Sequence, residues 1–232
     1  MGAEYPVHGL NRPGLLEFLT LFISMSIFIW NCQGAANPKF IATLRSFLQN
    51  LKPLMVVLVE PRISGVRADK AIKKIGLPHS HRVEANGFSG GIWLLWENCV
   101  DLTIIQSHHQ FIHAGISWPL VGLNTQFTAI YGSPTPSLRE RLWTDLKGIR
   151  TNSSGSWFLA GDFNAVLFSD ERKGGRSSLR SGNKSFVNFV AEHSLIDLGF
   201  SGPKYTWRRG TDRKSTRLNS SHSGESRMPS SA

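Results

Sequence analysis

Apolar residues follow two alternating patterns along the chain: short continuous runs and longer stretches with helical spacing. The continuous runs are rich in Val, Ile, Phe and Trp and stop at polar or turn-forming residues, which predicts buried β-strands. They are SIFIWN (26–31), LMVVLVE (54–60), GGIWLLW (90–96), DLTIIQS (101–107), TQFTAIYGSP (125–134), SWFLAGDFN (156–164) and the start of KYTW (204–207). We expect GGIWLLW and DLTIIQS to pair with each other.

Helical spacing predicts helices between these strands. In PKFIATLRSFLQNLK (38–52) the apolar positions recur every three or four residues and Pro38 stands where a helix can begin. The stretches LRERLWTDLKGI (138–149) and KSFVNFVAEHSL (184–195) have the same amphipathic pattern. Interleaved helices and strands indicate an α/β or α+β class. At 232 residues the chain fits one domain with tails.

Both ends of the chain differ from its middle. The apolar run 14–30 has the length of a signal or short membrane segment, but Glu17 and Ser24 interrupt it. We therefore interpret its second half as a strand, treat residues 1–24 as an upstream extension, and expect no membrane association. From Asp212 the chain is dominated by Ser and Arg, which is typical of disorder. Residues 212–232 also resemble translated sequencing adapter, which leaves 25–211 as the domain.

Charge and cysteine content narrow the function classes. The formal net charge is +10, which favours a polyanionic partner, with nucleic acid first. The two cysteines have no metal-ligand spacing, which favours a reduced compartment, nuclear or cytoplasmic, over a zinc site or disulfide scaffold. No stable protein partner can be inferred.

Several predicted strands end in a polar residue with ligand chemistry. Ligands gather beyond the carboxyl ends of strands in sheets with helical connections, so these residues form one candidate site. They are Asn31, Glu60, Tyr131, Asp162 and Asn164. Carboxylates suit a hard cation such as Mg²⁺, and amides and a tyrosine hydroxyl can bind phosphate oxygens. Simpler explanations stay open: an Asx turn at Asp162, a capping role for Asn31, a core position for Tyr131.

The ordered motifs resemble the endonuclease/exonuclease/phosphatase superfamily, and most closely the apurinic-type endonuclease domain of plant non-LTR (LINE-type) retrotransposons. The motifs are WNCQG (30–34), the strand-ending Glu in VLVEPRISG (57–65), GGIWLLW (90–96), AIYGSP (129–134), WFLAGDFNAVL (157–167), ERKGG (171–175) and IDLGFSGPKYTW (196–207). The resemblance implies a four-layer α/β/β/α sandwich with two mostly antiparallel sheets, here without the last C-terminal strands.

The same resemblance implies roles for individual residues. Glu60 would bind Mg²⁺, with Mn²⁺ as a substitute, and Asn31 would assist at the metal and phosphate. Tyr131 and Asn164 would contact the scissile phosphate or the leaving side, and Asp162 would orient or activate the attacking water. Thr206 would contact phosphate in a DNA groove, although an ordinary strand threonine is an equal alternative. The implied reaction is Mg²⁺-dependent hydrolysis of a DNA phosphodiester, which nicks the strand.

The chain also departs from the family pattern. The expected further Asp strand and Ser-Asp-His block do not follow KYTW, and Ser221 and His222 in the tail do not replace them. We therefore expect the chain as printed to be inactive or nearly so, which leaves its status as an enzyme open. Two alternatives remain: a phosphomonoesterase or inositol-phosphate phosphatase of the same superfamily, and a non-catalytic DNA-binding remnant.

Overall fold

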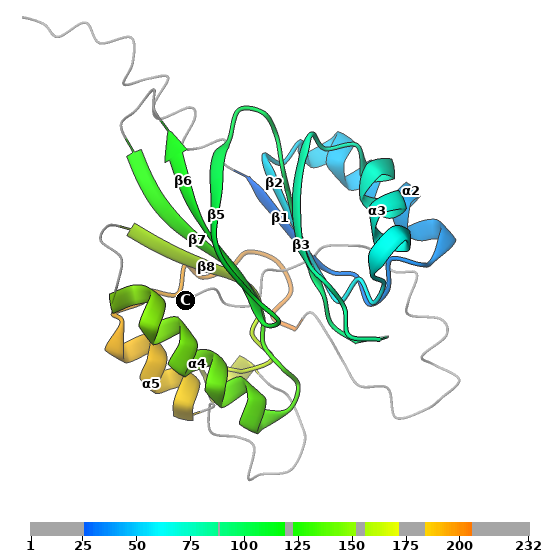
Figure 1. Cartoon of the computed structure of the whole chain (residues 1–232). Coiled ribbons are helices and arrows are strands. Elements are labelled where there is room, and N and C mark those ends of the chain that lie inside the picture. Colours follow the sequence, from blue (N-terminus) through cyan, green and yellow to red (C-terminus); the bar gives the residue numbers. More distant parts are fainter. Residues whose placement is uncertain (1–25, 88, 119–122, 152–155, 172–183, 206–232) are drawn as a thin grey trace, which may run out of the picture.

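Two β-sheets packed face to face form the centre of the protein, and helices cover both outer faces (Figure 1). The computed structural model describes residues 26–87, 89–118, 123–151, 156–171 and 184–205. The predicted four-layer α/β/β/α sandwich is confirmed, and four of the six strand pairs are antiparallel.

The first sheet contains the N-terminal strands in the order β1-β2-β4-β3. Its strands are β1 (Ile27–Asn31), β2 (Met55–Val59), β3 (His79–Val83) and β4 (Ile92–Trp96). Helices α2 (Pro38–Leu51) and α3 (Gly65–Ile75) lie on its outer face. Helix α2 begins where the sequence predicts, because the Asn37 side chain accepts a hydrogen bond from the Lys39 N–H and Pro38 occupies the first turn.

The second sheet has the order β5-β6-β7-β8. Its strands are β5 (Asp101–His108), β6 (Phe111–Trp118), β7 (Leu123–Tyr131) and β8 (Ser156–Asp162). Helices α4 (Pro136–Thr151) and α5 (Lys184–Glu192) pack on its outer face, and a short 3₁₀ helix, η2 (Ser169–Glu171), lies between β8 and α5 in the chain. Trp143 stacks on Phe163, Phe186 and Phe189, which ties the two helices to the end of β8.

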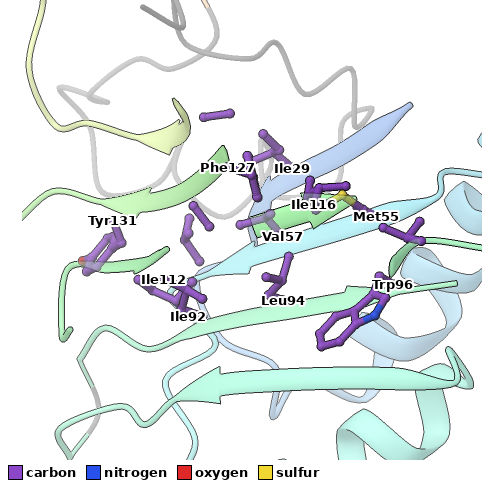
Figure 2. Packing of buried hydrophobic residues seen from close by; sticks show 14 residues of the cluster. Ile29, Met55, Val57, Ile92, Leu94, Trp96, Ile112, Ile116, Phe127 and Tyr131 are labelled. Carbon is purple, nitrogen blue, oxygen red and sulfur yellow. The ribbon is translucent and has the colours of Figure 1, made fainter. Parts of the chain in front are cut away.

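The space between the sheets is filled by aliphatic and aromatic side chains from both inner faces (Figure 2). Val57, Leu94 and Phe127 are completely buried there. Alternate strand residues point to opposite faces, so Phe28 and Leu58 join the separate cluster beneath α2 and α3 instead. Because β2 and β4 are buried on both faces, they consist of continuous apolar runs.

The two parallel strand pairs determine where polar strand ends meet. β1 pairs in parallel with β2, and β7 pairs in parallel with β8, with Tyr131 opposite Asp162. Parallel neighbours end at the same edge of a sheet. β1 also lies against β8 across the sandwich. The carboxyl ends of four strands therefore converge at one place.

Some predictions of local structure are wrong or incomplete. GGIWLLW and DLTIIQS do not pair with each other: β4 pairs with β2 and β3, whereas β5 pairs with β6 in the other sheet. The short connection between them crosses the sandwich, with Val100 buried in the central core. Helix α3 and strands β3 and β6 were not predicted.

Several expectations fall outside the described residues. These are the upstream extension 1–24, the tail 212–232 and most of the motif ERKGG (171–175). The predicted strand at KYTW is described only at Lys204 and Tyr205, which are not in a strand. Within the described ranges, no helix is long and apolar enough to cross a membrane.

Candidate active site

Glu60 lies at the centre of the converging strand ends. Its Oε1 accepts hydrogen bonds from the Tyr131 hydroxyl at 3.0 Å and from Asn31 Nδ2 at 3.4 Å. Its Oε2 accepts from Arg62 Nη2, which forms an ion pair with it. Residues from β1, the end of β2 and β7 thus meet at one carboxylate, as the sequence predicts for a shared site.

Asp162 is the second carboxylate of the cluster. Its Oδ2 accepts a hydrogen bond from Asn31 Nδ2 at 2.8 Å, and its Oδ1 accepts from the Asn164 backbone N–H at 2.9 Å. The second bond is an Asx turn, as the simpler explanation for this motif predicts. Asn164 Nδ2 donates to the Gly132 carbonyl at 2.8 Å, which joins the ends of β7 and β8.

The backbone around the cluster is held in an uncommon conformation. Gln33, Glu60, Arg62 and Asn164 all have positive φ angles, between 47° and 55°. Such angles cost energy in residues other than glycine and gather at functional sites. At Glu60 the reason is geometric: Val59 points into the core, so regular alternation would turn Glu60 to the opposite face. The positive φ of Glu60 breaks this alternation, and its carboxylate reaches Tyr131.

A glycine pair holds the Glu60 loop in place. The Glu60 N–H donates to the Gly91 carbonyl at 3.1 Å, and the Arg62 N–H donates to the Gly90 carbonyl at 3.2 Å. Pro61, between them, packs so closely that a Cβ on Gly91 would lie 2.9 Å from its Cγ. Gly91 also has a φ of 91°, so a side chain there would be both strained and obstructed.

Burial determines the electrostatics of the cluster. It raises the pKa of the Asp162 carboxyl above its usual value; the hydrogen bonds from Asn164 and Asn31 oppose this rise, and the nearby charge of Glu60 adds to it. Burial, together with Glu60, also raises the pKa of the Tyr131 hydroxyl. Tyr131 therefore stays a neutral hydrogen-bond donor at physiological pH.

The donor atoms suit a hard divalent cation. Asn31 Oδ1 is buried and, among the residues that the structure describes, has no hydrogen-bond partner. It belongs to the same amide whose Nδ2 donates to Glu60 and Asp162, so an amide oxygen without a partner lies within one side chain of both carboxylates. No group of three or more His, Cys, Asp or Glu gathers as a metal cage in the described ranges. Mg²⁺ needs only one or two protein carboxylates, because water and substrate phosphate complete its coordination.

The structure thus brings together Asn31, Glu60, Tyr131, Asp162 and Asn164. Thr206, also predicted for the site, lies outside the described residues.

Sequence reasoning missed two cations near the cluster. Arg62 pairs with Glu60, and the buried Arg139 of α4 donates from Nη1 to the Ser133 carbonyl and acts electrostatically on Asp162. The sequence offered one signal for Arg62, which is a basic residue two positions after a strand-ending carboxylate. For Arg139 the sequence offered no signal beyond its place in an amphipathic helix.

Comparison with known proteins identifies the family. The chain belongs to the endonuclease/exonuclease/phosphatase family, whose sequence model matches residues 29–219. Nucleases and phosphatases make up this family, and its enzymes generally use divalent metal ions. No curated protein matches the chain significantly in sequence.

Solved structures of two endonucleases and of a 3′ phosphatase have folds similar to that of this chain. The endonuclease domain of TRAS1, a telomere-specific non-LTR retrotransposon, has a TM-score of 0.57 at 16% identity, over 76% of this chain and 75% of that one. The AP endonuclease LMAP from Leishmania major has a TM-score of 0.53 at 13% identity, over 72% and 66%. The 3′ phosphatase NExo from Neisseria, bound to a product DNA hairpin, has a TM-score of 0.51 at 18% identity, over 76% and 72%. At these identities the similarity establishes the fold.

Proposed function

We propose that the strand-end cluster is the active site of a Mg²⁺-dependent phosphodiester hydrolase that nicks DNA. The observation that carries the proposal is the joining of Glu60 and Asp162 through Asn31, at the point where two parallel strand pairs end. The site thus combines a carboxylate for a metal with a second carboxylate that can accept a proton from water.

Each residue has a role that follows from its contacts. Glu60 and Asn31 would hold the divalent ion, which would neutralise charge on the scissile phosphate and stabilise the leaving oxygen. Asp162 uses one acceptor position on each oxygen for Asn31 and Asn164, so further lone pairs remain to orient and deprotonate water. Asn164 uses one N–H for Gly132 and keeps a second for the phosphate.

Charge supports DNA as the substrate. The chain carries a formal net charge of +10. Helix α3 is basic, and its side chains Arg67, Lys70, Lys73 and Lys74 are exposed. Basic side chains along a groove bind phosphates regardless of base sequence, and this binding weakens as salt rises. TRAS1 is a retrotransposon endonuclease, which fits the retrotransposon origin proposed from the motifs.

The experiment compares substrates and variants. Supercoiled plasmid with Mg²⁺ should be nicked faster by the natural chain than by Asp162→Asn or Glu60→Gln, and chelation should stop the reaction. The same preparations are tested for phosphate release from inositol phosphates and from 3′-phosphorylated DNA. Phosphate release without nicking would favour the phosphomonoesterase alternative. Salt-dependent DNA binding, with cleavage no faster than that of Asp162→Asn, would favour a DNA-binding remnant.

The rate at which the chain nicks DNA is a separate prediction. We infer that nicking is far slower than that of the TRAS1 endonuclease domain, because the residues that follow KYTW depart from the family pattern and members of a catalytic unit contribute jointly. The plasmid assay tests this with the TRAS1 endonuclease domain as the reference. A comparable rate would contradict the prediction of low activity while supporting the proposed reaction.

A further inference from the structure

One contact at the site has no part in the roles above: the guanidinium of Arg62 lies on Glu60. The side chain of Glu60 is 13% exposed and that of Arg62 is 41% exposed, so the arginine is the more solvent-accessible partner. Arg62 thus covers the carboxylate that would receive a metal ion.

Both oxygens of Glu60 are already engaged. Oε1 accepts from Tyr131 and Asn31, and Oε2 accepts from Arg62 Nη2. The two partners of Oε1 are neutral groups, which can remain beside a carboxylate that binds a cation. Arg62 is a permanent cation, and it occupies the position that a second cation would take at Oε2.

The backbone restricts how Arg62 can leave. Arg62 and Glu60 both have a φ of 55°, and their N–H groups are held by the carbonyls of Gly90 and Gly91. The loop is therefore fixed while the long, partly exposed side chain can rotate. A released guanidinium would stay near the site, where its planar fork matches the oxygens of a phosphate group.

We propose that Arg62 occupies Glu60 in the resting site and moves to the substrate phosphate when the divalent ion and DNA bind. The inference rests on the proposed function of the same site. Because one phosphodiester can bind the displaced arginine and the metal together, each ligand makes the other bind more tightly. Arg62 is therefore a phosphate-binding residue that also makes metal binding depend on substrate.

Titration calorimetry with Mn²⁺ tests this on the full chain, with and without a short duplex whose phosphorothioate linkages resist cleavage. Without DNA, Arg62→Met should bind Mn²⁺ about fivefold more tightly or better than the natural chain, because Glu60 no longer has a competing cation. The duplex should raise the Mn²⁺ affinity of the natural chain and raise that of Arg62→Met much less. Arg62→Lys should be intermediate, since a lysine keeps the charge without the planar fork.

Two controls make the result decisive. Arg141→Met removes the same charge from an exposed position on α4 and should leave both measurements unchanged. Circular dichroism melting in chelator confirms that each variant is folded. Equal or weaker Mn²⁺ binding by a folded Arg62→Met, in the absence of DNA, would overturn the role of Arg62.

Glu60→Gln separates this inference from the proposed function. It should abolish the Mn²⁺ binding on which both depend. If Glu60→Gln binds Mn²⁺ as well as the natural chain, both proposals fail. If it loses binding while Arg62→Met behaves like the natural chain, only the role of Arg62 fails.

Discussion

Asn31 and Asp162, 131 positions apart in the chain, are joined by a 2.8 Å hydrogen bond from Nδ2 to Oδ2. Asn31 ends a strand of the first sheet and Asp162 ends a strand of the second. This bond therefore connects the two halves of the sandwich at the site, and it fixes the spacing between the carboxylates of Glu60 and Asp162.

Removing that connection should destabilise the protein. Asn31→Ala leaves the partly buried Oδ2 of Asp162 without its donor, and we expect a loss of about 1–3 kcal/mol in the free energy of unfolding. Urea denaturation measures the loss. Asn98→Ala removes an exposed bond to His79 and should cost less than about 0.5 kcal/mol. Equal losses of unfolding free energy for the two substitutions would show that the bond between Asn31 and Asp162 stabilises the fold no more than an exposed hydrogen bond does.

Asp162→Asn should stabilise the fold at neutral pH while it lowers any catalysis. Burial raises the pKa of the Asp162 carboxyl, so the folded protein binds this proton more tightly than the unfolded chain does. Stability from this group is therefore present at low pH and is lost as pH rises through the raised pKa.

Calorimetric melting from pH 4 to pH 7 tests the sign. The melting temperature of Asp162→Asn should exceed that of the natural chain at pH 7, and the difference should shrink as the pH falls. A lower melting temperature for the variant at pH 7 would show that the hydrogen bonds of Asp162 outweigh the cost of burying its charge.

Gly161 should tolerate no side chain. It has a φ of 148°, and a Cβ on it would lie 1.9 Å from the Ile130 carbonyl in the neighbouring strand. Gly161→Ala must therefore push β8 away from β7, at a cost of about 3 kcal/mol or more in unfolding free energy. Gly148→Ala is the matched control: its Cβ meets nothing within 4 Å, and it should stabilise α4 by about 0.5–1 kcal/mol. A folded Gly161→Ala of natural stability would contradict the close approach of these strands.

The two cysteines should differ sharply in reactivity. Burial raises the pKa of the Cys32 thiol to about 12, and its Sγ lies 3.4 Å from the Val59 carbonyl. Cys99 is exposed. Because the thiolate is the reactive form, iodoacetamide at pH 8 should label Cys99 much faster than Cys32 in the native protein. Peptide mass spectrometry follows both sites, and equal labelling would show that the end of β1 is open to solvent.

Much of the site could be predicted because its residues follow strongly apolar strands. The apolar runs of β1, β2 and β8 each stop abruptly at a polar residue, so Asn31, Glu60 and Asp162 were visible without a structure. The order of the motifs around them carried the family resemblance, which implied their roles. Their meeting depends on the two parallel strand pairs, which no local pattern reveals.

Other features were hidden for identifiable reasons. Strand β3, with the sequence HSHRV, lies at the edge of its sheet and lacks an apolar run, so hydrophobic periodicity could not find it. β4 and β5 resemble a hairpin because few residues separate them, although the connection changes sheets. The contact between Arg62 and Glu60 depends on two positive φ angles, which the sequence does not display.

The proposed function depends most directly on whether a divalent ion binds at Glu60. Anomalous diffraction from crystals grown with the phosphorothioate duplex and soaked in Mn²⁺ locates such an ion without reliance on turnover. We expect one strong peak beside Glu60 and the Asn31 amide oxygen in the natural protein, and none there in Glu60→Gln. Saturating Mn²⁺ with no peak at Glu60, and with Arg62 still paired to its carboxylate, would contradict the proposed site.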